Sequence, residues 1–350
     1  MINSAIKPPV QIGIIGAGWV AGDRHIPAFK GNKLSDVSVV LDRNIDRAKE
    51  TAKKYRIPRF ISDLDSFLKE PVDAVSICTP PGEHGHLIEA AINAGKHVLV
   101  EKPMTLTSGE GKALTQLAKN SGVILCPAHS FLFSRAMLRA KSVIASGKAG
   151  EVRWATGIQL SSWRRRLPSW FDDLPGGLFF DEAPHFLYLM KYFLGELNVD
   201  QAWFHSDMID SRPDERLEAR LTGSRGNGQL MMWTGSPFSE WQFILFCSKA
   251  VLVLDLFRDV LILLPPEKAH NAKDILKLSA NGTLQLWKEI GITGLRLFKK
   301  RLFFGHDHLV NMFLEAIIRG EESPVATDDG YEIVALFEKI LNASSRKKDE

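Results

Sequence analysis

Lys102, Asp181 and His185 have side chains that could move a proton to or from a bound substrate. Lys102 comes soon after the apolar run 97–100, and the proline that follows it fixes the backbone. Asp181 and His185 are four residues apart, so one helix face presents both, and the carboxylate could orient an imidazole that takes a proton. Pro184 predicts that this helix starts or kinks there. The alternative for Lys102 is a surface lysine in contact with solvent. The alternative for His185 is a core histidine whose hydrogen bonds are made by its neighbour.

A glycine-rich turn, Gly16-Ala17-Gly18-Trp19-Val20-Ala21, follows the apolar run 12–15 and opens a helical pattern. Gly16 allows the tight turn, and Gly18 lets a pyrophosphate approach the backbone at the helix N-terminus. Asp42 ends the next apolar run, where an acid accepts hydrogen bonds from ribose hydroxyls. This pattern predicts a dinucleotide site rather than a merely structural turn. Asp42 favours NAD, whereas Arg43 could pair with a 2′-phosphate, so NADP stays open.

The elements around these residues alternate between short Val- and Ile-rich runs and amphipathic stretches. Continuous apolar runs of this kind are typical of buried parallel strands, and the alternation predicts a doubly wound sheet with right-handed crossovers. The carboxyl ends of such strands meet at one edge, where ligands bind. The expected strands are 12–15, 37–41, 74–78, 97–100 and 123–126, and the expected helices are 19–30, 45–55, 83–94 and 108–120.

After residue 127 the pattern changes to period-2 alternation with glycine-containing turns, which predicts an open, mainly antiparallel sheet. The fold class is therefore α/β: an N-terminal Rossmann domain over 1–127, and a C-terminal α+β domain over 128–350 for substrate binding and oligomerisation. The expected strands are 151–159, 201–206, 217–221, 228–233, 241–246 and 250–254, and the expected helices are 135–146, 179–194, 308–319 and 329–343. The last seven residues are expected to fray.

The stretches GAGWVA, CTPPGEH, AGKHVLVEKP and PGGLFFDEAPH, in this order, resemble the glucose–fructose oxidoreductase/inositol dehydrogenase (Gfo/Idh/MocA) family over nearly the whole chain. The resemblance implies NAD(P)-dependent oxidation or reduction of a hydroxyl or keto group of a sugar, cyclitol or nucleotide-sugar. It makes His185 the acid/base, Asp181 the carboxylate beside it and Lys102 the lysine that contacts substrate. The implied cofactor positions are Gly16, Gly18, Trp19, Val20, Asp42, Arg43, Thr79, Pro80, His84, Glu101 and Lys102.

The chain departs from the family pattern at several substrate-facing positions. Ala183 replaces a glycine, Tyr188 replaces the acid three residues after the histidine, and Leu132 replaces an arginine. A lost sugar contact could be remade by Tyr188, His129 or Arg135. No particular substrate therefore transfers from the family.

Two basic stretches and one histidine pair have competing interpretations. Within 161–170, three arginines beginning at Arg164 lie between Trp163 and Trp170 and could clamp a diphosphate and stack a base, although a solvated basic loop is at least as good an interpretation. The stretch 287–304 is basic and amphipathic; a packed helix or an oligomer contact is favoured, and a membrane surface is the alternative. His306 and His308 lack a third ligand nearby, so no metal site is expected.

Composition bounds the remaining classes. The 350 residues carry 44 Lys and Arg against 41 Asp and Glu, a balance that argues against a dedicated nucleic-acid binder. Three dispersed cysteines fit a reducing cytoplasm, and neither a signal peptide nor a membrane-spanning run is expected. We expect a cytoplasmic homodimer or homotetramer. The alternative functions are a non-catalytic NAD(H) sensor or scaffold, and an enzyme that recycles its cofactor during epimerisation or elimination on envelope-polysaccharide sugars.

Overall fold

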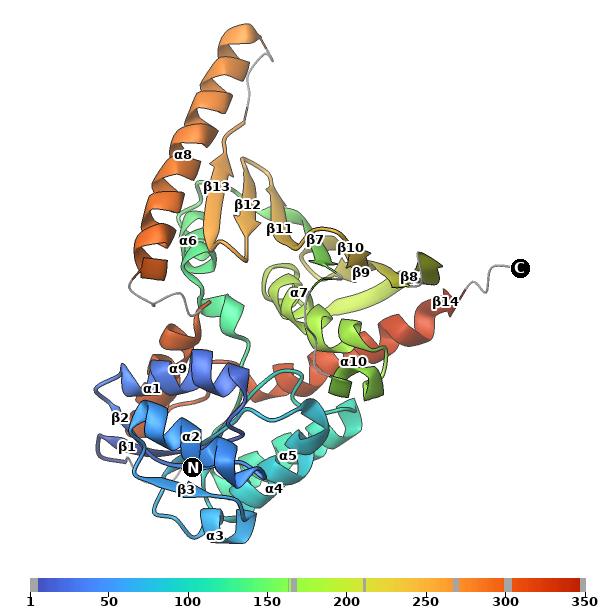
Figure 1. Cartoon of the computed structure of the whole chain (residues 1–350). Helices are drawn as coiled ribbons and strands as arrows, with labels where there is room; N and C mark the ends of the chain where they lie inside the picture. The colour runs from blue at the N-terminus through green and yellow to red at the C-terminus, as the bar shows by residue number, and fades with distance from the viewer. Residues whose placement is uncertain are drawn as a thin grey trace. The chain divides into compact units, whose positions relative to one another are not determined.

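A computed structural model describes residues 6–162, 164, 169–209, 212–266, 271–298 and 304–346. The chain forms two compact units (Figure 1). The first comprises Met1–Ser130 and Gly305–Ala335, and the second comprises Phe131–Phe304 and Leu336–Glu350. The expected single boundary after residue 127 takes no account of the later segment, because residues 305–335 pack with the first unit.

The first unit is built on a six-stranded sheet in the order β3-β2-β1-β4-β5-β6. Every neighbouring pair is parallel, and the order reverses between β1 and β4, as in a Rossmann fold. Strands β4, β5 and β6 are buried along their whole length, and Val39 of β2 also has no exposed surface. The strands are β1 (Val10–Ile15), β2 (Ser35–Leu41), β3 (Arg59–Ile61), β4 (Ala74–Ile77), β5 (His97–Val100) and β6 (Leu125–Pro127).

The helices of this unit begin and end at the residues that the sequence marks. Asn44 and Thr107 accept first-turn amide hydrogen bonds, and Gly122 ends its helix in the left-handed conformation. The glycine-rich turn leads into a π-helical turn, η1 (Ala21–His25), rather than directly into an α-helix. The α-helices are α1 (Ile26–Lys30), α2 (Ile45–Tyr55), α3 (Leu64–Leu68), α4 (His84–Asn93), α5 (Ser108–Ser121) and α9 (His306–Arg319), and the two units share α10 (Thr327–Ala343).

The second unit has an eight-stranded sheet in the order β13-β12-β11-β7-β10-β9-β8-β14. It is mainly antiparallel, as expected; only β7 with β10 and β8 with β14 run parallel. The expectation of a frayed end is wrong for Ser344–Arg346, which form β14. The other strands are β7 (Val152–Ser162), β8 (Leu197–Ile209), β9 (Arg212–Gly223), β10 (Gly226–Ser236), β11 (Glu240–Cys247), β12 (Val251–Asp255) and β13 (Val260–Leu264).

Among the described residues, three α-helices belong wholly to this unit: α6 (Arg135–Ala145), α7 (Leu178–Leu194) and α8 (Ala272–Phe298). Helix α7 begins six residues before Pro184 and continues through it, so the expected start at the proline is wrong. Its residues are buried along most of its length, and this packing offsets the backbone hydrogen bond that proline cannot make. None of the helices in the described ranges is long and apolar enough to span a membrane.

Candidate active site

The glycine-rich turn leaves open space at the position where a dinucleotide approaches the backbone. Gly16 donates its N–H to the Leu41 carbonyl at 2.7 Å and has φ +91°. A Cβ on Gly16 would lie 2.9 Å from the backbone of Cys78, so only glycine fits. A Cβ on Gly18, in contrast, would meet nothing within 4 Å. The turn therefore combines a close-packed first glycine with a second one that faces free space.

Asp42 connects the end of β2 to this turn. One carboxylate oxygen accepts the Ala17 N–H at 2.9 Å, and the other accepts the Asn44 N–H at 2.9 Å. Arg47 lies 3.5 Å away, and Arg43 is exposed. Oδ1 keeps a second lone pair, and Oδ2 shares its second one with Arg47 only over 3.5 Å, so the carboxylate can still accept ribose hydroxyls. The acid predicted from the sequence is thus fixed beside the glycine turn.

The residues after β4 add a second feature that fits a bound dinucleotide. Thr79 Oγ1 is buried and has no hydrogen-bond partner among the described residues. Buried hydroxyls are normally satisfied, so this oxygen is suited to a ligand group. Pro80 is half-buried beside it, Val20 is half-buried after the glycines, and Trp19 is exposed with Arg24 5.0 Å from its ring centre. The open space at Gly18 and the orphaned Thr79 hydroxyl both fit the dinucleotide that the sequence predicts.

His84 connects the loop after β4 to the loop after β5. Its ring is fully buried, with Nδ1 2.9 Å from the Pro103 carbonyl oxygen and Nε2 2.9 Å from that of Thr79. Burial lowers the pKa of His84, although both carbonyl contacts oppose this shift. The ring therefore holds the two loops together, and its nitrogens face protein carbonyls.

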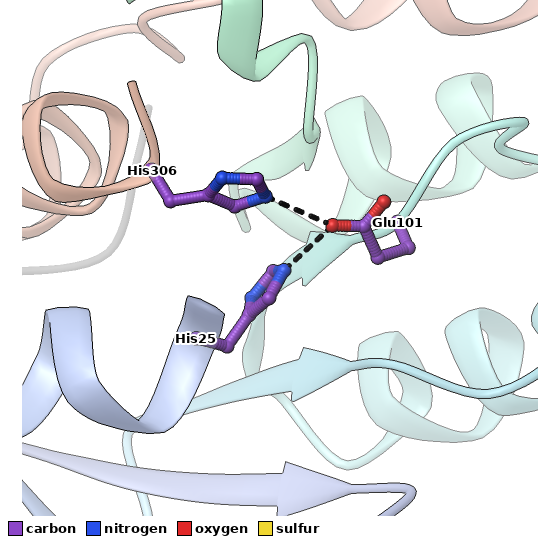
Figure 2. Close-up of side chains that lie close together, drawn as sticks. All are labelled: His25, Glu101 and His306. Carbon is purple, nitrogen blue, oxygen red and sulfur yellow. Dashed lines mark hydrogen bonds and ion pairs between the residues drawn. The ribbon is translucent and has the colours of Figure 1, made fainter. Parts of the chain in front are cut away.

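Glu101 is the centre of a buried cluster with two histidines (Figure 2). His25 Nε2 lies 2.7 Å and His306 Nε2 lies 3.2 Å from the same carboxylate oxygen, Oε1. The other oxygen accepts the backbone N–H of Lys102 at 3.2 Å. Burial raises the pKa of Glu101, but the bonds from both histidines outweigh it and hold that pKa well below its usual range. Glu101 is therefore a buried, ionised carboxylate.

The hydrogen bonds on the His25 side all point toward this carboxylate. Burial lowers the pKa of His25 and raises that of the Cys78 thiol, so the imidazole is neutral and the thiol keeps its proton at pH 7. A neutral His25 that donates from Nε2 must accept at Nδ1, where the Ser76 hydroxyl lies 2.8 Å away. Cys78 Sγ lies 3.6 Å from that hydroxyl and can donate to it. Thiol, hydroxyl and imidazole thus form one directed chain.

The cluster has the composition of a metal site, since its three ligand atoms lie within 4.8 Å of one another. Both imidazoles, however, already lie at hydrogen-bond distance from one oxygen, and these bonds satisfy the groups without an ion. In the sequence, His306 stands out only as half of a histidine pair without a third ligand, and no pattern marks His25. Lys102 itself is half-buried beside the cluster. The cluster therefore fixes the backbone from which the Lys102 side chain projects.

The residues of the second unit that the sequence predicts to be catalytic lie on α7. His185 is half-buried, with its Nδ1 2.9 Å from the Tyr188 hydroxyl, and that hydroxyl also accepts the Phe131 N–H at 3.2 Å. Phe131 and Trp241 pack on the imidazole, with ring centres 4.9 and 5.3 Å from it. Tyr188, which replaces the family's acid, therefore contacts the histidine directly.

The two carboxylates at the start of α7 have different environments. Asp181 is half-buried, whereas Glu182 is buried and accepts the Ser161 hydroxyl at 2.9 Å and the Gln159 amide. Glu182 thus connects α7 to β7, a role that the sequence did not indicate. Arg135, considered for a sugar contact, is instead paired with Glu289 of α8.

The remaining substrate candidates divide between the units. His129 is buried in the first unit, and Arg164 is exposed in the second. Trp163 lies outside the described residues. The structure brings together Gly16, Gly18, Asp42 and Thr79 in the first unit, with Lys102 beside Glu101, and it brings together His185 and Tyr188 in the second.

Comparison with known proteins identifies the family. Residues 10–129 match the oxidoreductase family with an NAD-binding Rossmann fold, and residues 137–252 match the GFO/IDH/MocA C-terminal domain. An oxidoreductase of Formosa agariphila is 32% identical over 67% of this chain and 73% of its own length. The dTDP-3,4-didehydro-2,6-dideoxy-alpha-D-glucose 3-reductase of Actinomadura kijaniata is 30% identical over 44% of this chain and 46% of its own length.

Solved structures share the fold at lower identity. Levoglucosan dehydrogenase in complex with NADH has a TM-score of 0.76 at 20% identity, covering 96% of this chain and 98% of its own. The WlbA dehydrogenase from Bordetella pertussis, in complex with NADH and UDP-GlcNAcA, has a TM-score of 0.76 at 18% identity, covering 97% and 96%. With both parts of the chain matched, the protein belongs to the Gfo/Idh/MocA family of NAD-binding oxidoreductases.

Proposed function

We propose that the protein is an NAD-dependent dehydrogenase or reductase that acts on a hydroxyl or keto group of a nucleotide-sugar or related sugar. The observation that carries the proposal is the glycine turn: Gly18 faces open space while Asp42 is fixed beside it by the Ala17 N–H. This arrangement is suited to a pyrophosphate over Gly18 and a ribose on Asp42. When bound, the nicotinamide supplies the hydride acceptor or donor.

Lys102 is assigned to the substrate oxygen. Its backbone N–H is held by Glu101, whose carboxylate is fixed in turn by His25 and His306. A lysine on a fixed backbone can direct its ammonium group at a hydroxyl or carbonyl oxygen and stabilise the charge that develops there. Glu101 then acts through Lys102 and is a positioning residue.

His185 is assigned to the substrate proton. To accept a proton at Nε2, the neutral imidazole must carry its own proton on Nδ1, and the Tyr188 oxygen 2.9 Å away can accept that Nδ1–H. The Phe131 N–H holds the same oxygen in place. Tyr188 thus sets the tautomer of His185, a task that the sequence analysis gave to Asp181. We keep Asp181 as the carboxylate that favours the protonated imidazole.

Two similar proteins and the position of Arg164 support the proposed substrate class. A relative is named a reductase of a dTDP-sugar, and a structural neighbour was solved with UDP-GlcNAcA. Arg164 is exposed two residues after the end of β7, and an exposed guanidinium suits a diphosphate. We therefore favour a nucleotide-sugar over a free sugar, in a homodimer or homotetramer in the cytoplasm.

Cofactor titration and turnover of the purified chain test this function. We expect NAD to bind and a panel of UDP- and dTDP-sugars to contain a substrate. Lys102→Ala and His185→Ala should each lower kcat by about 10²-fold or more, the usual size of acid–base terms, with NAD affinity retained. Lys112→Ala, an exposed lysine of α5, is the control. Full turnover in both variants would refute the catalytic roles of Lys102 and His185. Failure of both NAD and NADP to bind would refute the proposed function.

Asp42→Asn tests the choice of cofactor separately. The amide keeps an acceptor for one backbone N–H but removes the charge that disfavours a 2′-phosphate. We expect NAD to bind about tenfold more weakly and NADP to bind no worse, the shift expected from losing a charged hydrogen bond. Equal weakening of both cofactors would mean that Asp42 only supports the turn.

A further inference from the structure

Helix α8 packs on the protein through its polar side. Gln285 donates to the Leu263 carbonyl at 3.0 Å and accepts the Leu263 N–H at 3.0 Å. Glu289 is buried and paired with Arg135 and Arg139 of α6. These contacts hold α8 alongside β13 and α6, as Figure 1 shows in orange and green.

The same packing continues toward the C-terminal end of α8. The Thr293 hydroxyl donates to the Arg258 carbonyl at 3.0 Å, and Arg296 pairs with Asp259 at 2.6 Å. Polar side chains every third or fourth residue therefore face the protein along this half of the helix. Most helices that pack on a protein core turn an apolar stripe inward, whereas α8 turns polar side chains inward.

The opposite side of α8 is apolar and exposed. We call it the outer face, and define it by Leu276, Leu284, Trp287, Leu295 and Phe298, which are 55–87% exposed. Leu276 and Phe298 lie 22 residues apart in the sequence, which is about 33 Å along the helix. A continuous apolar stripe of this length in water marks an interaction surface.

The exposed charged residues of α8 itself are all of one sign. Lys277 and Lys288, three helical turns apart, are exposed along one margin of the outer face, and Lys273 is exposed just before its N-terminal end. The two acidic residues of α8 are not exposed: Glu289 is buried in its arginine pairs, and Asp274 is half-buried. A second copy of α8 would bring further lysines to this margin and no exposed acid to pair with them. An anionic surface is the complementary partner.

We propose that α8 lies in the surface of an anionic phospholipid membrane, with its outer face among the acyl chains and its lysines at the head groups. Leucine, tryptophan and phenylalanine on one side and lysines at the margin are the composition of an interfacial helix. Lysine stems can lie along the apolar layer while their ammonium groups reach the phosphates. The polar contacts to β13, α6 and Asp259 would hold the helix on the protein while the outer face is inserted.

Co-sedimentation of the full chain with vesicles tests the proposal and needs neither cofactor nor substrate. Vesicles of phosphatidylcholine with phosphatidylglycerol should bind the protein, phosphatidylcholine alone should bind it far less, and salt should weaken the binding. Lys277→Gln with Lys288→Gln should lower the partition coefficient about 25-fold, or about fivefold per lysine. Leu284→Gln with Trp287→Gln should lower it more than tenfold. Phe238→Gln, at an exposed phenylalanine outside α8, is the control and should bind as wild type.

Three results would overturn the proposal: no binding of the wild type to phosphatidylglycerol vesicles, binding that neither double variant weakens, or equal weakening by the control. Light scattering adds a further readout. If Leu284→Gln with Trp287→Gln breaks an oligomer while the wild type ignores vesicles, the outer face belongs to a second copy of the chain. Thermal unfolding confirms that each variant is folded, so loss of binding is not loss of structure.

Discussion

His97 should make the first unit sensitive to acid. It begins β5, is 3% exposed, and accepts the Ile124 N–H at Nδ1 over 3.0 Å. Burial lowers the pKa of His97 from 6.5 to about 4, and nearby Asp73 offsets only part of this shift. Protonation at Nδ1 would remove the acceptor for the Ile124 amide. The folded unit therefore excludes a proton that the unfolded chain takes up.

The size of the effect follows from the two pKa values. The contribution is fully present above pH 6.5 and is lost as the pH falls from 6.5 toward about 4. At 1.36 kcal/mol per pKa unit, this amounts to about 3 kcal/mol of unfolding free energy by pH 4. His97→Asn offers an oxygen to the same amide but no group that titrates in this range. Between pH 7 and pH 4, the wild type should therefore lose about 3 kcal/mol more unfolding free energy than the variant does.

Urea unfolding at a series of pH values measures this shift. Hydrogen-exchange mass spectrometry of peptides covering β5 and β6 confines the readout to the first unit, which a whole-chain signal does not. His86→Asn, at an exposed histidine of α4, is the matched control for the same substitution at a side chain that is not buried. If the free-energy difference for His97→Asn stays constant from pH 7 to pH 4, the buried imidazole does not cause the acid sensitivity.

Three further outcomes are expected. Gly16→Ala places a Cβ 2.9 Å from the Cys78 backbone at φ +91° and should abolish NAD binding in calorimetry, so unchanged affinity would contradict the turn geometry. Burial lowers the pKa of Lys141 to about 8, so the NMR signal of its methylated amine should titrate near pH 8, and a midpoint above 10 would contradict its burial. Burial raises the pKa of all three thiols, that of Cys126 to about 12, but Cys247 is half-buried whereas Cys78 and Cys126 are buried, so iodoacetamide at pH 8 should label only Cys247 in the folded chain, as peptide mapping can check.

The parallel sheet could be predicted because its central strands are short continuous apolar runs, and few other structures bury such runs on both faces. The strand β3 (Arg59–Ile61) could not, because its three residues are exposed or half-buried and form no apolar run. The helix start expected at Pro184, one of the two predicted alternatives, was wrong for a related reason. The penalty of a proline inside a helix is local, whereas the burial of α7 that offsets it depends on the whole unit.

The site could be predicted where the chemistry is local in sequence. The glycine turn and Asp42 form a recognisable spacing, and the structure places them together. The Glu101 cluster could not be found this way, because 76 residues separate His25 from Glu101 and 205 separate His306 from it. No short spacing records such contacts. The orientation of α8 was also hidden, because periodicity shows that a helix has two faces but not which one the protein covers.

The first unit consists of two chain segments that are synthesised at different times. Its sheet is complete once residue 130 has left the ribosome, but its segment 305–335 follows only after the intervening residues of the second unit. At about 5–20 residues per second, this interval lasts about 10–35 s. Throughout it, the Glu101 carboxylate has His25 but not His306, and the surface that α9 covers is bare. The nucleotide-binding unit of a nascent chain would therefore be incomplete for tens of seconds. During this time chaperones could bind the surface that α9 later covers.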